Sequence, residues 1–254
     1  MDTLKALIFD VDGTLAETER DGHRLAFNRA FQEFGLPWRW DEGLYGKLLD
    51  IGGGKERITY FLKRYRSDFQ PPMELEVLVK KLHMAKTAHF KALLETGGIQ
   101  PRPGVLRLIQ SAQKRGIRLA IATTSAPANA LALLTSVFAP EAPSWFEVIA
   151  AGDMVPAKKP APDIYQYVLD HLGLPPEACV AIEDSRQGLL AATTAGLATA
   201  VTVNDYTRHH DLALADLVVN HLGEPSEPFE VLQGPKEFGY FFTLDLAQYL
   251  LINR

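Results

Sequence analysis

Short apolar runs alternate with amphipathic stretches along most of this chain. The first run, residues 7–9, is too short for a helix and stops at two carboxylates, Asp10 and Asp12. Later runs of strand length cover residues 118–122, 146–150, 179–182, 197–203 and 217–219. Helical patterns separate these runs, as expected for a parallel sheet with helices packed on it. We therefore predict an α/β fold with a doubly wound, Rossmann-like parallel sheet.

One long stretch after the first strand lacks strand patterns. Apolar residues at 25, 27, 30, 31 and 34 mark one helical face, and further helices are predicted over 41–49, 55–65 and 74–94. The simplest architecture is a discontinuous core, residues 1–15 plus 98–254, with an all-helical cap domain, residues 16–97, inserted into it. A last helix over 244–252 is expected to pack on the core.

Composition narrows the possible partners and compartments. A formal net charge of −5 over 254 residues gives no basic excess, so nucleic acid is not an expected partner. No apolar run reaches membrane-span length, and residues 1–5 lead directly into the first strand, so we expect a cytoplasmic protein without a leader or a membrane partner. Cys179 is the single cysteine and is expected to be buried packing. We expect a monomer with no obligate protein partner.

The two acids after the first strand indicate a functional site. Open α/β sheets bind ligands beyond the carboxyl ends of their strands, which is where Asp10 and Asp12 stand. Two like charges this close are costly unless a cation or a proton intervenes, so the pair indicates a hard metal ion, one protonated acid, or both. A surface Asp-x-Asp-Gly turn is the competing interpretation.

Two further polar groups follow later core elements. Thr123, Thr124 and Ser125 come directly after the second core strand, where hydroxyls and backbone amides can bind phosphoryl oxygens or cap a helix. Lys159 stands before Pro160 in a loop, and its ammonium can neutralise a phosphate or hold a carboxylate. A solvated loop lysine is the alternative.

A second strand that ends in acids completes the set. Glu183 and Asp184 close the run over residues 179–182. With Asp10 and the Asp12 carbonyl, they supply the hard oxygen ligands that Mg²⁺ prefers. The sequence therefore predicts a magnesium site at this edge of the sheet.

In order, Asp-x-Asp-Gly-Thr, strand-Thr, Lys-Pro and strand-Glu-Asp-Ser resemble the four motifs of the haloacid dehalogenase-type phosphatases. The resemblance implies that Asp10 attacks phosphorus and forms an aspartyl phosphate, and that Asp12 acts as general acid and then base. It implies that Thr123 holds a phosphoryl oxygen and Lys159 offsets negative charge. It also implies a Mg²⁺ site at Asp184, with Glu183 in direct or indirect contact. An acid at the Asp12 position is typical of the phosphate-ester members, so dehalogenation is disfavoured.

The predicted cap carries the signals for substrate choice. Gly53, Gly54, Lys55, Glu56 and Arg57 join a flexible turn to a cationic helix start, where the helix dipole disfavours positive charge. A negatively charged ligand would resolve that conflict.

His83 and Lys86 are three residues apart on the longest predicted helix, so they share a face that could extend the same cationic pocket. Solvated surface charge is the alternative for this pair.

The cap is similar to that of the CbbY group, the xylulose-1,5-bisphosphate phosphatases, through residues 16–19, 53–58 and 83–87. By position, the resemblance implies that residues of the cap and core strands bind a sugar bisphosphate: Glu19, His23, Gly53, Gly54, Lys55, Glu56, Arg57, His83, Lys86, Thr123, Thr124, Ser125 and Asn129. It implies removal of the 1-phosphate to give xylulose 5-phosphate, which would remove an inhibitor of Rubisco. Only the tail after Gly223 lies outside this resemblance.

Three alternatives remain for a chain with this fold. A β-phosphoglucomutase-like isomerase returns the phosphoryl group to sugar instead of water. The Gly-Gly-Lys-Glu-Arg sequence at residues 53–57 of the cap argues against this alternative. A phosphatase for another small phosphorylated metabolite would differ only in the cap. A binding protein on this fold would be expected to have lost Asp10, Asp12, Lys159 or Asp184, and all four are present.

Overall fold

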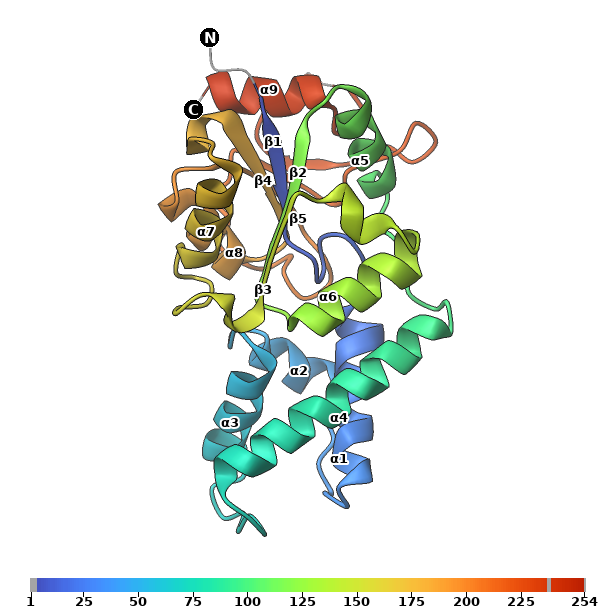
Figure 1. Cartoon of the computed structure of the whole chain (residues 1–254), viewed down its shortest axis with the longest axis vertical. Coiled ribbons are helices and arrows are strands. Elements are labelled where there is room, and N and C mark those ends of the chain that lie inside the picture. The colour runs from blue at the N-terminus through green and yellow to red at the C-terminus, as the bar shows by residue number, and fades with distance from the viewer. Residues whose placement is uncertain (1–3, 237–238, 254) are drawn as a thin grey trace.

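A seven-stranded sheet forms the centre of the computed structural model, which describes residues 4–236 and 239–253 (Figure 1). The strands are β1 (Ala6–Phe9), β2 (Arg118–Thr123), β3 (Val148–Ala151), β4 (Cys179–Glu183), β5 (Ala198–Thr202), β6 (Leu217–Val219) and β7 (Val231–Gln233). Their order is β3-β2-β1-β4-β5-β6-β7, and β7 alone runs antiparallel to its neighbour. The predicted doubly wound fold is therefore confirmed, while residues 1–3, 237–238 and 254 of the predicted core lie outside the described residues.

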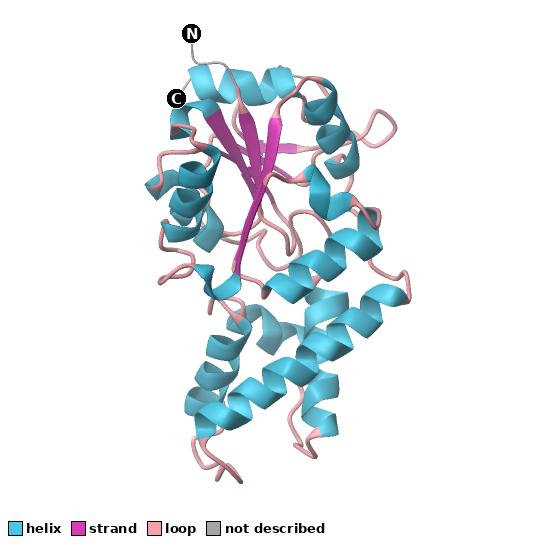
Figure 2. Ribbon diagram, viewed as in Figure 1, coloured by secondary structure: helices cyan, strands magenta, loops and turns pink. Residues whose placement is uncertain are grey.

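Side chains of the central strands alternate between two apolar layers. Leu7 and Phe9 pack with α5 (Val105–Lys114), α6 (Pro127–Leu133) and α9 (Leu244–Ile252). Ile8 faces the opposite way, toward α7 (Asp163–Leu172) and α8 (Arg186–Thr194). Figure 2 shows helices on both faces of the sheet. Because both faces are covered, the strands contain continuous apolar runs with no alternation of polar residues.

Four further helices lie at the carboxyl ends of the strands: α1 (Arg24–Glu33), α2 (Glu42–Leu48), α3 (Gly54–Tyr65) and α4 (Leu75–Glu95). We call them the helical layer. The predicted ends of α2, α3 and α4 differ from these by at most one residue. An aromatic cluster that includes Phe27, Phe31, Trp40 and Phe61 gives the layer its own core. Phe90, near the end of α4, instead belongs to the apolar cluster of the sheet.

The tail holds one element that the pattern did not predict. β7 is three residues long and none of its residues is buried, so it lacks the apolar run by which the other strands were found. The predicted last helix occurs as α9, whose Leu246 and Leu250 are buried in the core.

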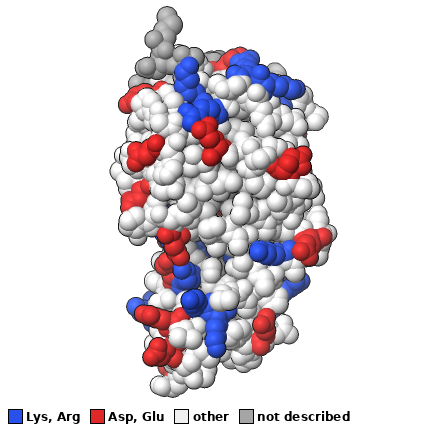
Figure 3. All heavy atoms as spheres, viewed as in Figure 1, with Lys and Arg blue, Asp and Glu red and all other residues white. Residues whose placement is uncertain are grey.

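Three compositional expectations can be compared with the fold. Within the part of the chain that is described, no helix has the length and apolar character of a membrane span. On the face shown in Figure 3, acidic and basic side chains are interspersed and form no broad basic field. Cys179 is fully buried in the sheet, as predicted.

Candidate active site

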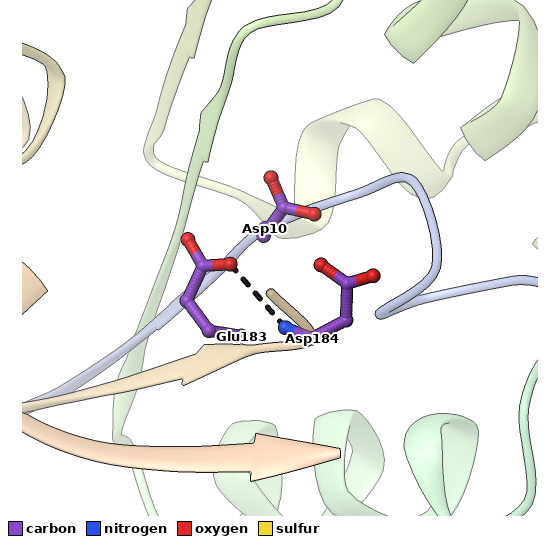
Figure 4. Close-up of side chains that lie close together, drawn as sticks. All are labelled: Asp10, Glu183 and Asp184. Carbon is purple, nitrogen blue, oxygen red and sulfur yellow. Dashed lines mark hydrogen bonds between the residues drawn. The ribbon is translucent and has the colours of Figure 1, made fainter. Parts of the chain in front are cut away.

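Three carboxylates converge where β1 and β4 end side by side. The two strands pair in register, with Phe9 opposite Ile182, so Asp10 comes to lie beside Glu183 and Asp184 (Figure 4). Each of these acids offers an oxygen within 4.8 Å of the others. β2 and β3, which follow β1 in the chain, lie on one side of the β1–β4 pair, and β5, β6 and β7, which follow β4, lie on the other side. The strand order therefore switches between β1 and β4, and ligands bind at such switch points.

The charges in this cluster conflict with one another. Burial raises the pKa of Asp10 to about 8, with the nearby Lys159 opposing the rise and Glu183 adding to it. Burial, followed by the charges of Asp10 and Glu183, places the pKa of Asp184 well above its usual range. A hard divalent cation would remove this repulsion, and the oxygen-only donor set suits Mg²⁺. The residues present therefore fit the predicted metal site.

Lys159 is held in a fixed position beside the predicted nucleophile. Its ammonium donates to Asp10 Oδ1 at 2.7 Å, to Glu183 Oε1 at 2.5 Å and to the Ala122 carbonyl at 2.8 Å. The Tyr165 hydroxyl also donates to Glu183 Oε1. Glu183 is fully buried, so its carboxylate holds the Lys159 ammonium in place. Its Oε2 accepts a hydrogen bond from the backbone N–H of Asp184 at 3.3 Å.

Asp12 faces the helical layer. Its Oδ1 accepts from the Thr18 hydroxyl at 2.6 Å and lies 2.7 Å from His23 Nε2, while Ser125 donates to Oδ2. Lys86 Nζ lies 2.9 Å from His23 Nδ1. A charged lysine can only donate, so Nδ1 accepts and Nε2 carries the proton toward Asp12. Burial would raise the pKa of Asp12, but His23 and the two hydroxyls together hold it well below its usual range.

A cavity lies between the strand ends and the helical layer. It contains all the predicted site residues of the core except Glu183, which lies beneath it. Most predicted residues of the cap line it as well, namely Glu19, His23, Gly53, Gly54, Arg57, His83 and Lys86, together with Thr123, Thr124, Ser125 and Asn129 from the core. The structure thus brings most of the two predicted sets together around one space.

Two buried basic side chains from the helical layer also line this cavity. Arg57 is 8% exposed, and its guanidinium donates to the Leu48 carbonyl at 3.0 Å and to the Tyr45 hydroxyl at 3.0 Å. Lys86 is 4% exposed, and burial lowers its pKa to about 8. Burial and the charge of Lys86 lower the pKa of His83 to about 4, so His83 offers a hydrogen bond at neutral pH and not the positive charge that was predicted.

Lys55 and Glu56 are placed differently from the prediction. Neither lines the cavity. Lys55 pairs with Asp153, and Glu56 accepts from Lys158 Nζ at 2.5 Å. Lys158 also lies 2.9 Å from Asp153, so the four charges form one network that joins α3 to the loops of the core.

The turn at Gly53 allows the Lys158 ammonium to lie close to the start of α3. Gly53 has φ +92°, and a Cβ there would lie 2.8 Å from Lys158 Nζ. Lys55 and Glu56 thus have ion-pair partners that sequence spacing did not reveal.

The sequence prediction missed one wall of the cavity. Ser185, Gln187, Asn204, Tyr206, Thr207 and His210 also line it. Asn204 follows β5, so the rule that identified Asp10, a polar residue after a buried strand, could have found it. Tyr45 was also missed, because its hydroxyl reaches Glu19 Oε2 at 2.5 Å from another helix.

A family comparison matches this geometry. Residues 4–196 match the model of the haloacid dehalogenase-like hydrolases. The chain belongs to the haloacid dehalogenase-like hydrolase family. It is an enzyme of that family, a phosphoric monoester hydrolase. All four core motifs of the haloacid dehalogenase-like hydrolases meet in the cavity described above.

Several relatives in this family are similar over most of their length. Protein CbbY of Cereibacter sphaeroides is 48% identical over 221 residues, which are 87% of this chain and 94% of the relative. A crystal structure of a CbbY variant from Rhodobacter sphaeroides in complex with xylulose-1,5-bisphosphate is 46% identical, with a TM-score of 0.81, covering 88% of this chain and 98% of that one.

The predicted likeness to the CbbY group is thereby confirmed. A β-phosphoglucomutase from Clostridium difficile has a TM-score of 0.73 over 98% of both chains but only 19% identity, so it shows the fold alone.

Proposed function

We propose that the chain is a Mg²⁺-dependent sugar-bisphosphate phosphatase that removes the 1-phosphate of xylulose-1,5-bisphosphate and yields xylulose 5-phosphate. The observation that carries this proposal is one cavity lined both by the nucleophile Asp10 from the core and by the buried cations Arg57 and Lys86 from the helical layer. Hydrolysis of a monophosphate needs only the core residues, whereas a bisphosphate also needs positive charge for its second phosphate. The similar CbbY structure with a bound xylulose bisphosphate supports the choice of sugar. In the cell, such an enzyme would remove an inhibitor of Rubisco.

The first chemical step would take place at Asp10. Its carboxylate attacks phosphorus and forms an aspartyl phosphate, while Thr123 at the end of β2 holds a phosphoryl oxygen. Lys159 lies 2.7 Å from Asp10 Oδ1 and would balance the added negative charge. Asp10, the Asp12 carbonyl, Asp184 and, directly or indirectly, Glu183 would hold Mg²⁺, which supplies further charge neutralisation for the phosphoryl group.

Asp12 would transfer a proton in both steps. As general acid it protonates the departing sugar oxygen, and as general base it then takes a proton from the water that attacks the aspartyl phosphate. The Lys86–His23–Asp12 chain of hydrogen bonds gives this carboxylate a proton donor at 2.7 Å. Asp12 is thus the catalytic group that is linked, through His23, to Lys86 of the helical layer.

We further propose that residues 16–97 act as a cap on a core of residues 1–15 and 98–254. The separate aromatic cluster of the helical layer supports this division. The end of α4 contacts the core across this division, because Phe90 packs into the sheet cluster.

The proposal includes a cytoplasmic monomer with no nucleic acid, membrane or obligate protein partner. Light scattering after gel filtration tests the monomer directly, and a stable dimer would contradict it.

Substrate choice is tested by phosphate release. We expect Mg²⁺-dependent release from xylulose-1,5-bisphosphate to be much faster than from ribulose-1,5-bisphosphate or β-glucose 1-phosphate. Weak activity on all three would reject the assigned sugar. Conversion of the glucose phosphate without phosphate release would identify an isomerase instead.

A further inference from the structure

The turn that follows β5 connects the acidic cluster to the helical layer, and the proposed chemistry does not use it. Asn204, at the start of this turn, is 8% exposed. Its side-chain Nδ2 donates to Asp184 Oδ2 at 2.7 Å. A buried hydrogen bond to a carboxylate is among the stronger ones in proteins, so this contact constrains how Asp184 points.

The orientation of the Asn204 amide is fixed by the turn itself. Its Oδ1 accepts the backbone N–H groups of Tyr206 at 2.9 Å and Thr207 at 3.2 Å. The backbone N–H of Asn204 in turn donates to the Thr207 hydroxyl at 3.0 Å. Because two donors face Oδ1, the NH₂ group must face Asp184. One side chain therefore holds a carboxylate at one end and the turn at the other.

The other surroundings leave this pair little freedom. Gly13 has φ +84°, and a Cβ there would lie 2.8 Å from Asn204 Nδ2 and collide with the Asp184 carboxylate. The buried guanidinium of Arg102 donates to the Val203 carbonyl at 2.6 Å and also to the Gly13 carbonyl. Arg102 therefore fixes the chain just before Asn204 against the turn that carries Gly13.

The far end of the turn reaches the helical layer. The Tyr206 ring lies 6.0 Å from the Tyr45 ring between centroids, in an edge-on arrangement. A Cβ at Gly46 would lie 3.1 Å from Tyr206 Cδ1, so the tyrosine packs directly on the backbone of α2. Asp205 also pairs with Arg20 at 3.1 Å. Thus the residues from 204 to 206 bridge the cavity from the acids to α2.

We propose that Asn204 is a positioning residue that orients the Asp184 carboxylate for the cation and, through the turn ending in Tyr206, couples that orientation to the docking of α2. This inference rests on the proposed function in that it requires a divalent cation at the acidic cluster. The coupling is reciprocal: if the cation favours the docked turn, docking favours the cation to the same degree.

Asn204→Ala and a matched control, Asn220→Ala, test the first half of this inference in the full chain. Asn220 follows β6 as Asn204 follows β5, and its Oδ1 also accepts two backbone N–H groups, from His221 at 3.0 Å and Glu230 at 2.8 Å. Calorimetric titration with Mg²⁺ alone should show about tenfold weaker binding by Asn204→Ala than by Asn220→Ala. Affinities within about twofold of each other would overturn the positioning role.

Hydrogen exchange of α2 with and without saturating Mg²⁺ tests the coupling. Mg²⁺ should slow exchange of α2 in the unaltered protein and in Asn220→Ala, but not in Asn204→Ala. Tyr206→Ala keeps the contact to Asp184 and should also lose the protection, so it tests the link even if Asn204→Ala does not fold. Undiminished protection in Tyr206→Ala would overturn the coupling. Neither readout uses a substrate, so an error in the assigned sugar leaves both results unchanged.

Discussion

The two sides of the cavity hold their polar groups by different means. On the core side, Asp10 and Asp184 follow paired parallel strands, and Lys159 is held by three hydrogen bonds to buried partners. On the helical side, Arg57 is held by the carbonyls of Leu48, at the end of α2, and of Ile51, and by the Tyr45 hydroxyl. Backbone pairing therefore fixes the core side, whereas packing between helices fixes the other. The core side should control the chemistry and the helical side the choice of substrate.

The largest effect is expected from Asp10→Asn on the core side. The amide keeps the shape but lacks the nucleophilic carboxylate, so turnover should fall by about a thousandfold or more. Phosphate release is the measurement, with circular dichroism to verify the fold. Asp170→Asn, an exposed site on α7, is the matched control and should retain activity. Retained turnover in Asp10→Asn would reject the nucleophile.

A second substitution separates the two sides. Arg57→Ala should raise KM for the bisphosphate by about tenfold to a hundredfold, because it would remove the buried charge that we propose binds the second phosphate. For a sugar monophosphate the change should be much smaller. The control is Arg64→Ala, an exposed position on the same helix. Equal losses on both substrates would place the second phosphate elsewhere.

Alkaline pH should weaken binding of the bisphosphate on the helical side, because Lys86 loses its charge. Burial lowers the pKa of Lys86 to about 8, so the ammonium is charged below that pH and neutral above it. KM for the bisphosphate should rise about fivefold between about pH 7 and about pH 9.5. Lys86→Met should remove this rise, whereas the exposed Lys81→Met should keep it. A rise of the same size in Lys86→Met would assign the titration to another group.

The smallest effect is expected at Lys55. Its ion pair with Asp153 is largely exposed, and such pairs contribute about 0.2–1 kcal/mol. Lys55→Ala should change KM by no more than about threefold, less still at high salt. Asp153→Asn also loses the pair with Lys158, so its effect should be at least as large as that of Lys55→Ala. A loss in Lys55→Ala as large as in Arg57→Ala would mean that Lys55 reaches the second phosphate after all.

The difference between the two sides of the cavity also explains which features the sequence could predict. Asp10, Thr123 and Asp184 were identified because the end of a buried parallel strand has a fixed place at one edge of the sheet. Lys159 was found through its motif. The predicted sheet and helices agree with the structure because their apolar patterns are long or continuous.

Other features depend on contacts between distant segments. Spacing placed Lys55 and Glu56 at a cationic helix start but could not show that Asp153 and Lys158 lie opposite them. These partners are more than ninety residues apart in the sequence and leave no local pattern. The neutral state of His83 follows first from burial by the segments packed around it and then from the charge of Lys86 on the same helix, and its place on α4 does not reveal that burial.

Trapping the phosphoryl group during turnover of xylulose-1,5-bisphosphate would test Asp10 as the nucleophile. Acid quench within the first turnover, followed by peptide mass spectrometry, should find one phosphoryl group on the carboxylate of Asp10. Release of phosphate with no labelled peptide, or with the label on a residue other than Asp10, would show that the core side does not perform the chemistry through this aspartate.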